Sequence, residues 1–295
     1  MLIYIKIIGV ERINNIVLNL MKESNEYDSM AYKNKKIIYI NYGLNLISKK
    51  GLVTFIGALI FKKKLIVHWI GSDLYSILLD SRKSKMKKYA TIFLNKMFDV
   101  TNWVASPLLK EELKELGIAS EVVYIPTELV RSVDILPLPA ELSFISYLPK
   151  TNHEFYGSEL VFRLAKNNPD IDFHIVANDG EGMPEFENIK YHGWVNDLKM
   201  DELYNSTYGV IRLPIHDALG GTVIEAVLRG RYAIWTFEAS YVFTANNYDQ
   251  LESSILKISK KTNPNFSGSQ YIQEHFNYNK LRDDFIKKIN KVAQR

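Results

Sequence analysis

The chain has 295 residues, of which 47% are hydrophobic and 24% are charged, and these proportions exclude a disordered, collagen-like or coiled-coil protein. It contains no cysteine, which excludes disulfide scaffolds, cysteine-based zinc sites and thiol nucleophiles. The formal net charge of +4 is too small for a typical nucleic-acid-binding protein, so no nucleic-acid partner is expected.

Two apolar segments bear on the location of the protein in the cell. The initial MLIYIKIIG lacks the basic region and the cleavage site of a signal peptide, and a buried strand explains it better. The longest apolar stretch, Gly51–Phe61, is shorter than the roughly 20 residues that a membrane-spanning helix needs. We therefore expect a cytoplasmic protein.

The first half of the chain alternates short apolar runs with helical patterns, as buried parallel strands and their connecting helices do. A helix is expected over Lys85–Phe98, where apolar residues at helical spacing share one side and lysines the other. A second helix is expected over Pro107–Leu116, because Ser106 is a typical cap and a proline suits the first turn. The strands expected here are Leu2–Ile8, Lys36–Ile40, Leu65–Ile70, Asn102–Ala105 and Glu121–Tyr124.

A stretch with three prolines and no clear periodicity, Ile125–Glu141, is expected to link two domains. A second alternating series follows it. Its expected strands are Leu142–Tyr147, Phe173–Ala177, Ile189–Tyr191, Tyr208–Arg212 and Tyr232–Trp235. Its expected helices are Gly157–Asn167, Lys199–Asn205, Thr222–Arg229 and Asp249–Ser259, with one or two more after Pro264, the last being Asn279–Ala293.

This pattern predicts an α/β fold with two Rossmann-like, doubly wound parallel-sheet domains. We expect them at residues 1–138 and 139–272, followed by a helical tail at 273–295 that packs back across the domains. Ligands in such folds bind beyond the carboxyl ends of the strands, and two such domains are expected to face a cleft.

The most informative segment is RLPIHDALGGTVIEAVLRGRYAIW, which begins at Arg212. A strand is expected to end near Arg212 and a helix to begin near Thr222, with Glu225 in its first turn. The two glycines before that helix let a ligand approach the backbone, and the helix N-terminus offers free N–H groups and a partial positive charge, which suits a diphosphate. The sequence lacks G-x-G-x-x-G, Walker A, H-E-x-x-H and G-x-S-x-G patterns, which disfavours a dehydrogenase, P-loop NTPase, zincin or α/β-hydrolase.

The same segment resembles the E-x7-E signature of retaining glycosyltransferases with the GT-B fold, the large family-4 type, whose common pattern is E-G-F-G-L-P-V-x-E-A-x-A-x-G. Aligned on Glu225, this chain has D-A-L-G-G-T-V-I-E-A-V-L-R-G, so Asp217 replaces the first glutamate and Thr222 the proline. HWIGSDL, SYLPK to DFHIV, and NIKYHGWVND to VIRLP resemble other segments of the family in the same order. The resemblance is strongest over residues 142–235 and weaker before them.

The resemblance implies that Glu225 binds the ribose of a nucleotide and that Asp217 faces the donor sugar. Glu225 is also explained by a capping box with Thr222, and Asp217 by a hydrogen bond within a turn. The shorter side chain of Asp217 implies an altered sugar preference, or a weak or inactive enzyme. His216 beside it is a minor candidate, since a histidine at such a place is more often structural.

The resemblance further implies that Gly220 and Gly221 present backbone N–H groups to the diphosphate, the alternative being a loop that only requires positive φ. Members of the family add an arginine and a lysine to offset the diphosphate charge. The lysine position aligns with Tyr156, so Lys150 or Arg212 is expected to substitute, although a solvated charge also explains each of them.

In the N-terminal half, Ile70 of WIGSD stands where the family often has a histidine. His68 or Asp73 is therefore expected to contact the acceptor hydroxyl or the donor sugar, and a core histidine is the alternative for His68. Gly9 is expected near the donor phosphates, or else in a tight turn. Gly193-Trp194-Val195 resembles the loop that borders the nucleotide base, although Trp194, like Tyr156 and Trp235, is also explained as a core residue.

Two basic segments, Lys62–Lys64 and Arg82–Lys88, adjoin apolar residues. Many members of the family use lipid-linked acceptors and attach to membranes through a basic, apolar face, so the resemblance implies an anionic membrane surface as a partner. The protein would then be peripheral on the inner face of the membrane. An ordinary solvated helix face is the equal alternative.

The favoured function is transfer of a hexosyl-type sugar from a UDP- or GDP-sugar to a sugar, lipid-linked or protein acceptor, with retention of the anomeric configuration. The resemblance implies no metal and no cofactor, because the helix dipole and basic side chains offset the diphosphate charge. One alternative is a catalytically weak relative that only binds a nucleotide sugar. The other is a different two-domain α/β protein, such as a sugar-binding protein or a GT-B-like epimerase.

Overall fold

The computed structural model describes residues 5–8, 11–23, 37–42, 53, 56–57, 60, 62–126 and 133–294. Gly9 and most of the apolar stretch Gly51–Phe61 lie outside the described residues. The chain divides into two compact units, Met1–Glu128 with Tyr278–Arg295, and Leu129–Asn277. The division between the units therefore falls before the expected one at 138/139, and the last helix belongs to the first unit.

The first unit is built on a parallel sheet with the strand order β1-β2-β3-β4-β5. Its strands are β1 (Ile5–Ile8), β2 (Ile37–Asn41), β3 (Lys64–Trp69), β4 (Val100–Val104) and β5 (Glu121–Val122). Every residue of β2 is buried, and so is β3 from Leu65 onward. Burial on both faces explains why these strands read as unbroken apolar runs.

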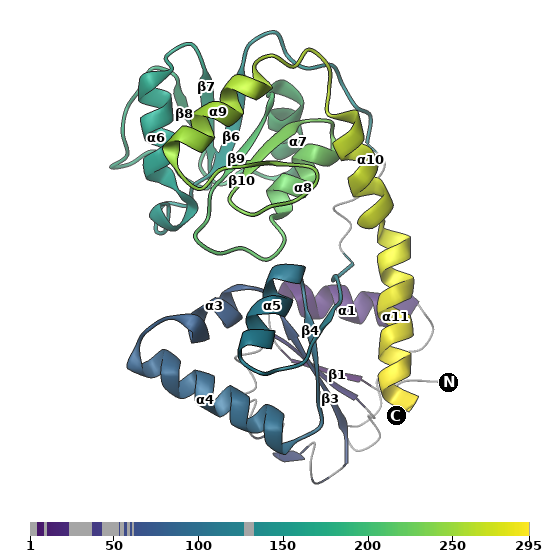
Figure 1. Ribbon diagram of the computed structural model, residues 1–295. Coiled ribbons are helices and arrows are strands. Elements are labelled where there is room, and N and C mark those ends of the chain that lie inside the picture. Colours follow the sequence, from purple (N-terminus) through teal and green to yellow (C-terminus); the bar gives the residue numbers. More distant parts are fainter. Residues whose placement is uncertain are drawn as a thin grey trace. The chain divides into compact units, whose positions relative to one another are not determined.

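Two helices from opposite ends of the chain pack on one face of this sheet (Figure 1). They are α1 (Glu11–Glu23) and α11 (Tyr278–Gln294). Leu20 of α1 and Phe285 of α11 are buried in one cluster with Tyr39 and Trp103 of the strands. Three more helices of the unit lie within residues 62–126: α3 (Ser72–Leu78), α4 (Arg82–Met97) and α5 (Pro107–Glu115).

Helix α4 exposes its apolar side. The outward residues are Met86, Tyr89, Phe93 and Met97, whose exposed fractions are 67, 69, 59 and 59%. The side that packs against the protein carries Ser84 and Thr91 together with Leu94. An amphipathic helix normally buries its apolar stripe, so α4 has the reverse orientation.

The second unit contains a six-stranded parallel sheet with the order β11-β10-β9-β6-β7-β8. Its strands are β6 (Ser143–Tyr147), β7 (Asp172–Val176), β8 (Ile189–Tyr191), β9 (Gly209–Arg212), β10 (Tyr232–Trp235) and β11 (Phe243–Thr244). The strand order reverses at β6, which pairs with β7 on one side and with β9 on the other. Such a reversal is the point of an open α/β sheet where ligands bind.

Helices cover both faces of this second sheet (Figure 1). Helices α6 (Ser158–Asn167) and α9 (Tyr248–Ile258) pack together on one face. Helices α7 (Asp197–Ser206), α8 (Gly221–Leu228) and α10 (Phe266–His275) lie on the other. A short 3-10 turn, η3 (Glu154–Tyr156), precedes α6.

The predicted fold class is confirmed, because both units are α/β with parallel sheets. Strands β8 and β10 have the predicted bounds. Within the described ranges, no helix combines the length and the apolar character needed to cross a membrane.

Candidate functional site

One predicted site residue of the second unit, Arg212, lies where the strand order of its sheet reverses. Tyr147 is the last residue of β6 and Arg212 the last of β9, and the two strands are paired neighbours. Because parallel strands end at the same edge of a sheet, both side chains lie at its carboxyl edge. The loop from Leu213 to Gly220 connects this edge to the N-terminus of α8.

Arg212 and Asp217 form an ion pair within this loop. Arg212 Nε donates to Asp217 Oδ2 at 2.6 Å, and the two side chains are only 12% and 14% exposed. The other Asp217 oxygen, Oδ1, accepts from the backbone N–H of Ala218 at 3.0 Å. The interpretation of Arg212 as a solvated charge is therefore wrong, since the guanidinium is largely buried against a carboxylate.

Two tyrosine rings flank the same guanidinium. Arg212 Cζ lies 5.6 Å from the ring centre of Tyr147 and 5.1 Å from that of Tyr156. The two rings meet edge to face, with centres 5.0 Å apart. These distances are within the range of cation–π attraction.

A glycine fixes the turn that carries Tyr156. Gly157 has φ +76, and a Cβ there would lie 2.7 Å from Leu213 Cβ and 2.8 Å from Leu213 O. The turn is also joined to the loop after β9 by a hydrogen bond from Ile215 N–H to Phe155 O, 2.9 Å long. Position 157 thus requires glycine, and the close approach brings Tyr156 against Arg212.

The N-terminus of α8 differs from the predicted cap. The helix begins at Gly221, preceded by Gly220 with φ +58, and no side chain caps it. Thr222 Oγ1 is buried and has no hydrogen-bond partner among the described residues, and the same is true of Trp235 Nε1. The capping box expected of Thr222 and Glu225 is therefore wrong. Because helix starts leave N–H groups without intrahelical partners, this end offers donors at the carboxyl edge of the sheet.

Glu225 lies in the second turn of α8 and faces α7. Tyr204 Oη donates to Glu225 Oε2 at 3.1 Å. Burial raises the pKa of Glu225, although the Tyr204 hydrogen bond and the charge of Arg229 act in the opposite direction. The carboxylate is thus held by another side chain and not by the backbone of its own helix.

The remaining candidates of this unit are less enclosed. Lys150 is paired with Asp179 at 3.1 Å and with Glu181, and its side chain is 41% exposed. Trp194 is 79% exposed, so a core role is wrong for it, and its ring centre lies 6.4 Å from that of Tyr147. His216, Gly193 and Val195 are half-buried.

The two described candidates of the first unit, His68 and Asp73, are buried in its interior. His68 is fully buried, and Tyr39 Oη lies 2.6 Å from its Nδ1. Trp103 packs edge-on against the imidazole at 5.9 Å, and burial lowers the pKa of His68 to about 3. Within this unit His68 is a core residue, not one that an acceptor can reach. The buried Asp73 accepts from the N–H groups of Ile70 and Gly71 at 3.1 and 2.9 Å, which closes the turn into α3.

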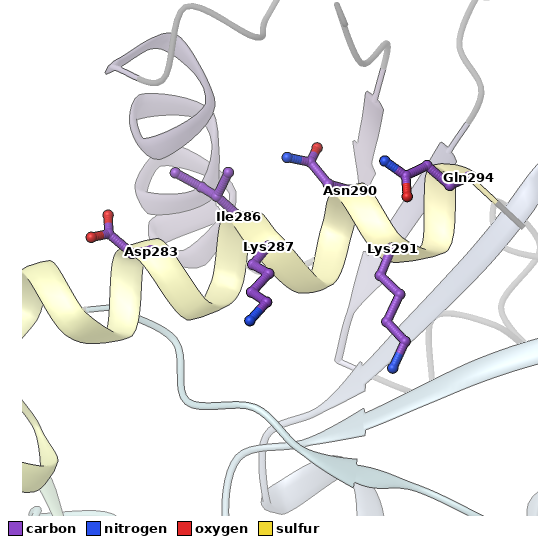
Figure 2. A pocket seen from close by; sticks show the side chains of 6 residues that line it. All are labelled: Asp283, Ile286, Lys287, Asn290, Lys291 and Gln294. Atoms are coloured by element: carbon purple, nitrogen blue, oxygen red, sulfur yellow. The ribbon is translucent and has the colours of Figure 1, made fainter.

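In the part of the chain that the structure describes, no three His, Asp or Glu side chains converge to hold a metal ion. Figure 2 shows a cavity along α11 of the first unit, lined by Asp283, Ile286, Lys287, Asn290, Lys291 and Gln294. All six belong to one helix, and none is a predicted site residue.

Comparison with known proteins gives a fold and no close relative. No protein-family model matches the sequence, and no curated protein matches it. Solved structures match over nearly the whole chain. Sucrose-phosphate synthase from Thermosynechococcus elongatus superposes with a TM-score of 0.68 over 96% of this chain and 79% of its own, at 12% identity.

Two other matches are of similar quality. The lipopolysaccharide outer core galactosyltransferase WaaB gives a TM-score of 0.66 at 13% identity, covering 97% of this chain and 99% of its own. HepE from Anabaena, solved with UDP and glucose, gives 0.63 at 15% identity, covering 93% and 80%. The chain has the GT-B fold. Identities this low establish the fold alone.

Proposed function

We propose that the protein is a glycosyltransferase that moves a sugar from a nucleotide diphosphate sugar to an acceptor. The GT-B fold supports a transferase of this general kind, since its structural neighbours are glycosyltransferases. The single observation that carries the proposal is the N-terminus of α8, which opens at the point where the sheet order reverses. An uncapped helix start with glycine on either side of its boundary suits a diphosphate.

Different residues bind the diphosphate, the ribose and the base of the donor. The backbone of Gly220 and Gly221 approaches the diphosphate, and Thr222 Oγ1 offers a buried polar atom without a partner. Glu225 binds the ribose hydroxyls, and Trp194 borders the base. The reaction retains the anomeric configuration, and the chain stabilises the charge of the leaving diphosphate through backbone N–H groups and basic side chains.

Glu225→Gln tests the donor site. The amide oxygen can still accept from Tyr204, and the change removes a carboxylate whose pKa burial raises, so the free energy of unfolding at pH 7 should not fall. A charged hydrogen bond to ribose contributes about 1.5–3 kcal/mol, so UDP or GDP affinity should fall by about 10- to 100-fold. Binding is measured by calorimetry, with the exposed Glu202→Gln as the control. Unchanged affinity would contradict the proposed role of Glu225.

Turnover separates the enzyme from a binding protein. Purified protein is incubated with UDP- and GDP-sugars and a panel of sugar and lipid-linked acceptors, and the released nucleotide is measured. Binding without any release or transfer would favour the alternative of a nucleotide-sugar-binding protein. Absence of all nucleotide binding would favour a different two-domain α/β function.

We further propose that α4 attaches the protein to an anionic membrane surface. Its exposed apolar stripe is flanked by Arg82, Lys83, Lys85 and Lys96, all of them exposed, and the helix contains no acidic residue. Apolar side chains with basic neighbours are typical of helices that lie in a membrane interface, where each basic residue near an anionic surface contributes about 1 kcal/mol. A face with this composition is not explained by packing within the first unit.

Flotation with liposomes tests this attachment. The protein should float with vesicles that contain phosphatidylglycerol and not with pure phosphatidylcholine. Replacement of Met86 and Phe93 by serine should abolish flotation. Lys110→Gln with Lys114→Gln removes two positive charges from α5, away from the apolar stripe of α4, and should leave flotation intact. A parent protein that never floats would refute the attachment.

A further inference from the structure

Helices α7 and α8 meet through two pairs of polar side chains. Asp201 and Tyr204 lie on α7, and Glu225 lies on α8 before Arg229, the residue that follows that helix. Intervals of three and four residues place each pair on one face of its helix. Tyr204 Oη donates to Glu225 Oε2 at 3.1 Å, and Arg229 Nη2 donates to Asp201 Oδ1. Of these four side chains, the proposed function uses Glu225 alone.

Tyr204 is fixed in place from more than one direction. Its side chain is fully buried, and Arg229 Cζ lies 5.0 Å from the centre of its ring, within the range of cation–π attraction. Arg229 is itself held, because Nη1 donates to the backbone oxygen of Glu225 at 2.9 Å and Nη2 to Asp201. Burial and the charge of Glu225 raise the pKa of Tyr204 well above its ordinary value, so the hydroxyl keeps its proton and remains a donor.

The hydroxyl of Tyr204 occupies one oxygen of the Glu225 carboxylate and leaves the other available. The Oη atom lies 3.1 Å from Glu225 Oε2 and 3.5 Å from the backbone oxygen of Thr222. Its single proton is directed at the carboxylate, which is the nearer and the charged acceptor. Glu225 is only half-buried, and Oε1 has no partner among the described residues. A ligand that contacts Glu225 therefore meets Oε1.

The same neighbours act on the charge of Glu225. Burial raises the pKa of this carboxyl, and the charges of Asp197 and Asp201 raise it further. The Tyr204 hydrogen bond and the charge of Arg229 lower it. Tyr204 and Arg229 thus favour the ionised form, which accepts hydrogen bonds at both oxygens and donates none.

We propose that Tyr204 is a positioning residue for the donor: its hydroxyl anchors Glu225 Oε2 and thereby directs Oε1 at the ribose hydroxyls of the nucleotide. Arg229 holds the ring of Tyr204, with Asp201 as its counterion. The inference rests on the proposed function and deepens it, because it makes selection of the ribose depend on two helices and not on Glu225 alone. A nucleotide that lacks the 2′ and 3′ hydroxyls has nothing for this arrangement to recognise.

Calorimetry with UDP, GDP and their 2′,3′-dideoxy analogues tests the proposal. In wild-type protein the analogue of the nucleotide that binds should be about 10- to 100-fold weaker, because it cannot donate to the carboxylate. Tyr204→Phe keeps the ring but releases Oε2. It should reduce this ratio by about three- to tenfold and leave the affinity for the analogue within about twofold of wild type.

Tyr232→Phe is the matched control for loss of a hydroxyl. Tyr232 is also a buried tyrosine of the second unit, and its hydroxyl donates to the backbone oxygen of Asn263 at 2.9 Å. It begins β10, so it lies at the amino edge of the sheet, away from the proposed donor site. The ratio between nucleotide and analogue should stay at its wild-type value in this variant.

The pH dependence of the same ratio provides a readout that loss of stability does not produce. The phosphates titrate equally in nucleotide and analogue, so the ratio reports Glu225 and should fall as the pH drops through its pKa. Tyr204→Phe and Arg229→Met each remove a group that lowers this pKa, so both should move the midpoint of that fall to higher pH. Arg163→Met should not, although Arg163 also stacks on a tyrosine, at 3.9 Å from the ring centre of Tyr248. All variants are compared at equal folded fraction, determined by circular dichroism.

The outcomes separate this inference from the proposed function. Wild-type protein that binds neither UDP nor GDP overturns both. Wild-type protein that binds a nucleotide and its dideoxy analogue equally well overturns the ribose contact of Glu225, and this inference with it, while a nucleotide site stands. A ratio and a midpoint that Tyr204→Phe and Arg229→Met leave unchanged, or equal losses for nucleotide and analogue, overturn the role of Tyr204 alone.

Discussion

Replacement of His68 by asparagine would show whether this histidine is sealed in the first unit. Asparagine is smaller and does not titrate, and its side-chain oxygen can still accept from Tyr39, whose hydroxyl lies 2.6 Å from His68 Nδ1. The other histidines of the chain, at 153, 174, 192, 216 and 275, belong to the second unit. The comparison therefore isolates one histidine in the first unit.

The magnitude follows from the low pKa of the buried imidazole. Burial lowers the pKa of His68 to about 3, against 6.5 in an unfolded chain. As the pH falls, the unfolded chain therefore binds a proton at His68 before the folded chain does. The contribution of the neutral imidazole to the free energy of unfolding is fully present above pH 6.5 and is lost as the pH falls below it. Between pH 7 and pH 5 this linkage costs the first unit about 2 kcal/mol in wild-type protein, and nothing in the asparagine variant.

The assay is urea unfolding at pH 7 and pH 5, followed by hydrogen–deuterium exchange of peptides from β2, β3 and β4. Carboxylates titrate equally in both proteins, so the difference between their pH dependences reports His68. The wild type should lose about 2 kcal/mol more than the variant. Equal pH dependence would mean that His68 titrates normally, as a residue accessible to an acceptor would, and would refute the burial argument.

Two further predictions concern the second unit. Gly157→Ala should lower its free energy of unfolding by about 2–4 kcal/mol, because it combines a positive φ with a Cβ 2.7 Å from Leu213 Cβ. Gly182→Ala has a similar φ of +74 with open space around it, and should cost only about 1–2 kcal/mol in the same urea titration; equal losses would contradict the steric argument. Asn188→Asp should cost about 3 kcal/mol or more at pH 7, because Asn188 Nδ2 donates to three backbone carbonyls at 2.9–3.0 Å and a carboxylate would face them without a proton. The loss should shrink at pH 4, and a pH-independent loss would contradict it.

The alternation of apolar runs and helical patterns was sufficient to predict the fold class. Short apolar runs that alternate with helical patterns indicate parallel strands covered by helices on both faces. Two of these strands, β8 and β10, have the predicted bounds. The pattern missed β11, which has two residues and no periodicity to detect. The helical spacing predicted the apolar stripe of α4 but not that the stripe is exposed, because spacing along a helix does not determine which side packs against the protein.

The candidate site was less predictable than the fold. The Thr222–Glu225 spacing fits a capping box, yet the helix starts one residue earlier, and Glu225 is bound by Tyr204 from another helix. The pairing of Arg212 with Asp217 depends on the path of a loop, which no local pattern specifies. Tyr147 was missed because an aromatic residue in an apolar run reads as core. Its place at the end of β6, where the strand order reverses, is the signal that identifies it.

The last helix completes the core of the first unit, which has a consequence for how the protein is made. Phe285, Ile289 and Val292 of α11 are buried against residues contributed by the N-terminal half of the chain. The ribosome delivers the whole second unit before it delivers these residues. Until then, the part of the sheet face that α11 covers stays exposed in the first unit, while the second unit can already fold. A nascent chain arrested before residue 285 would present one finished unit and one that chaperones must shield.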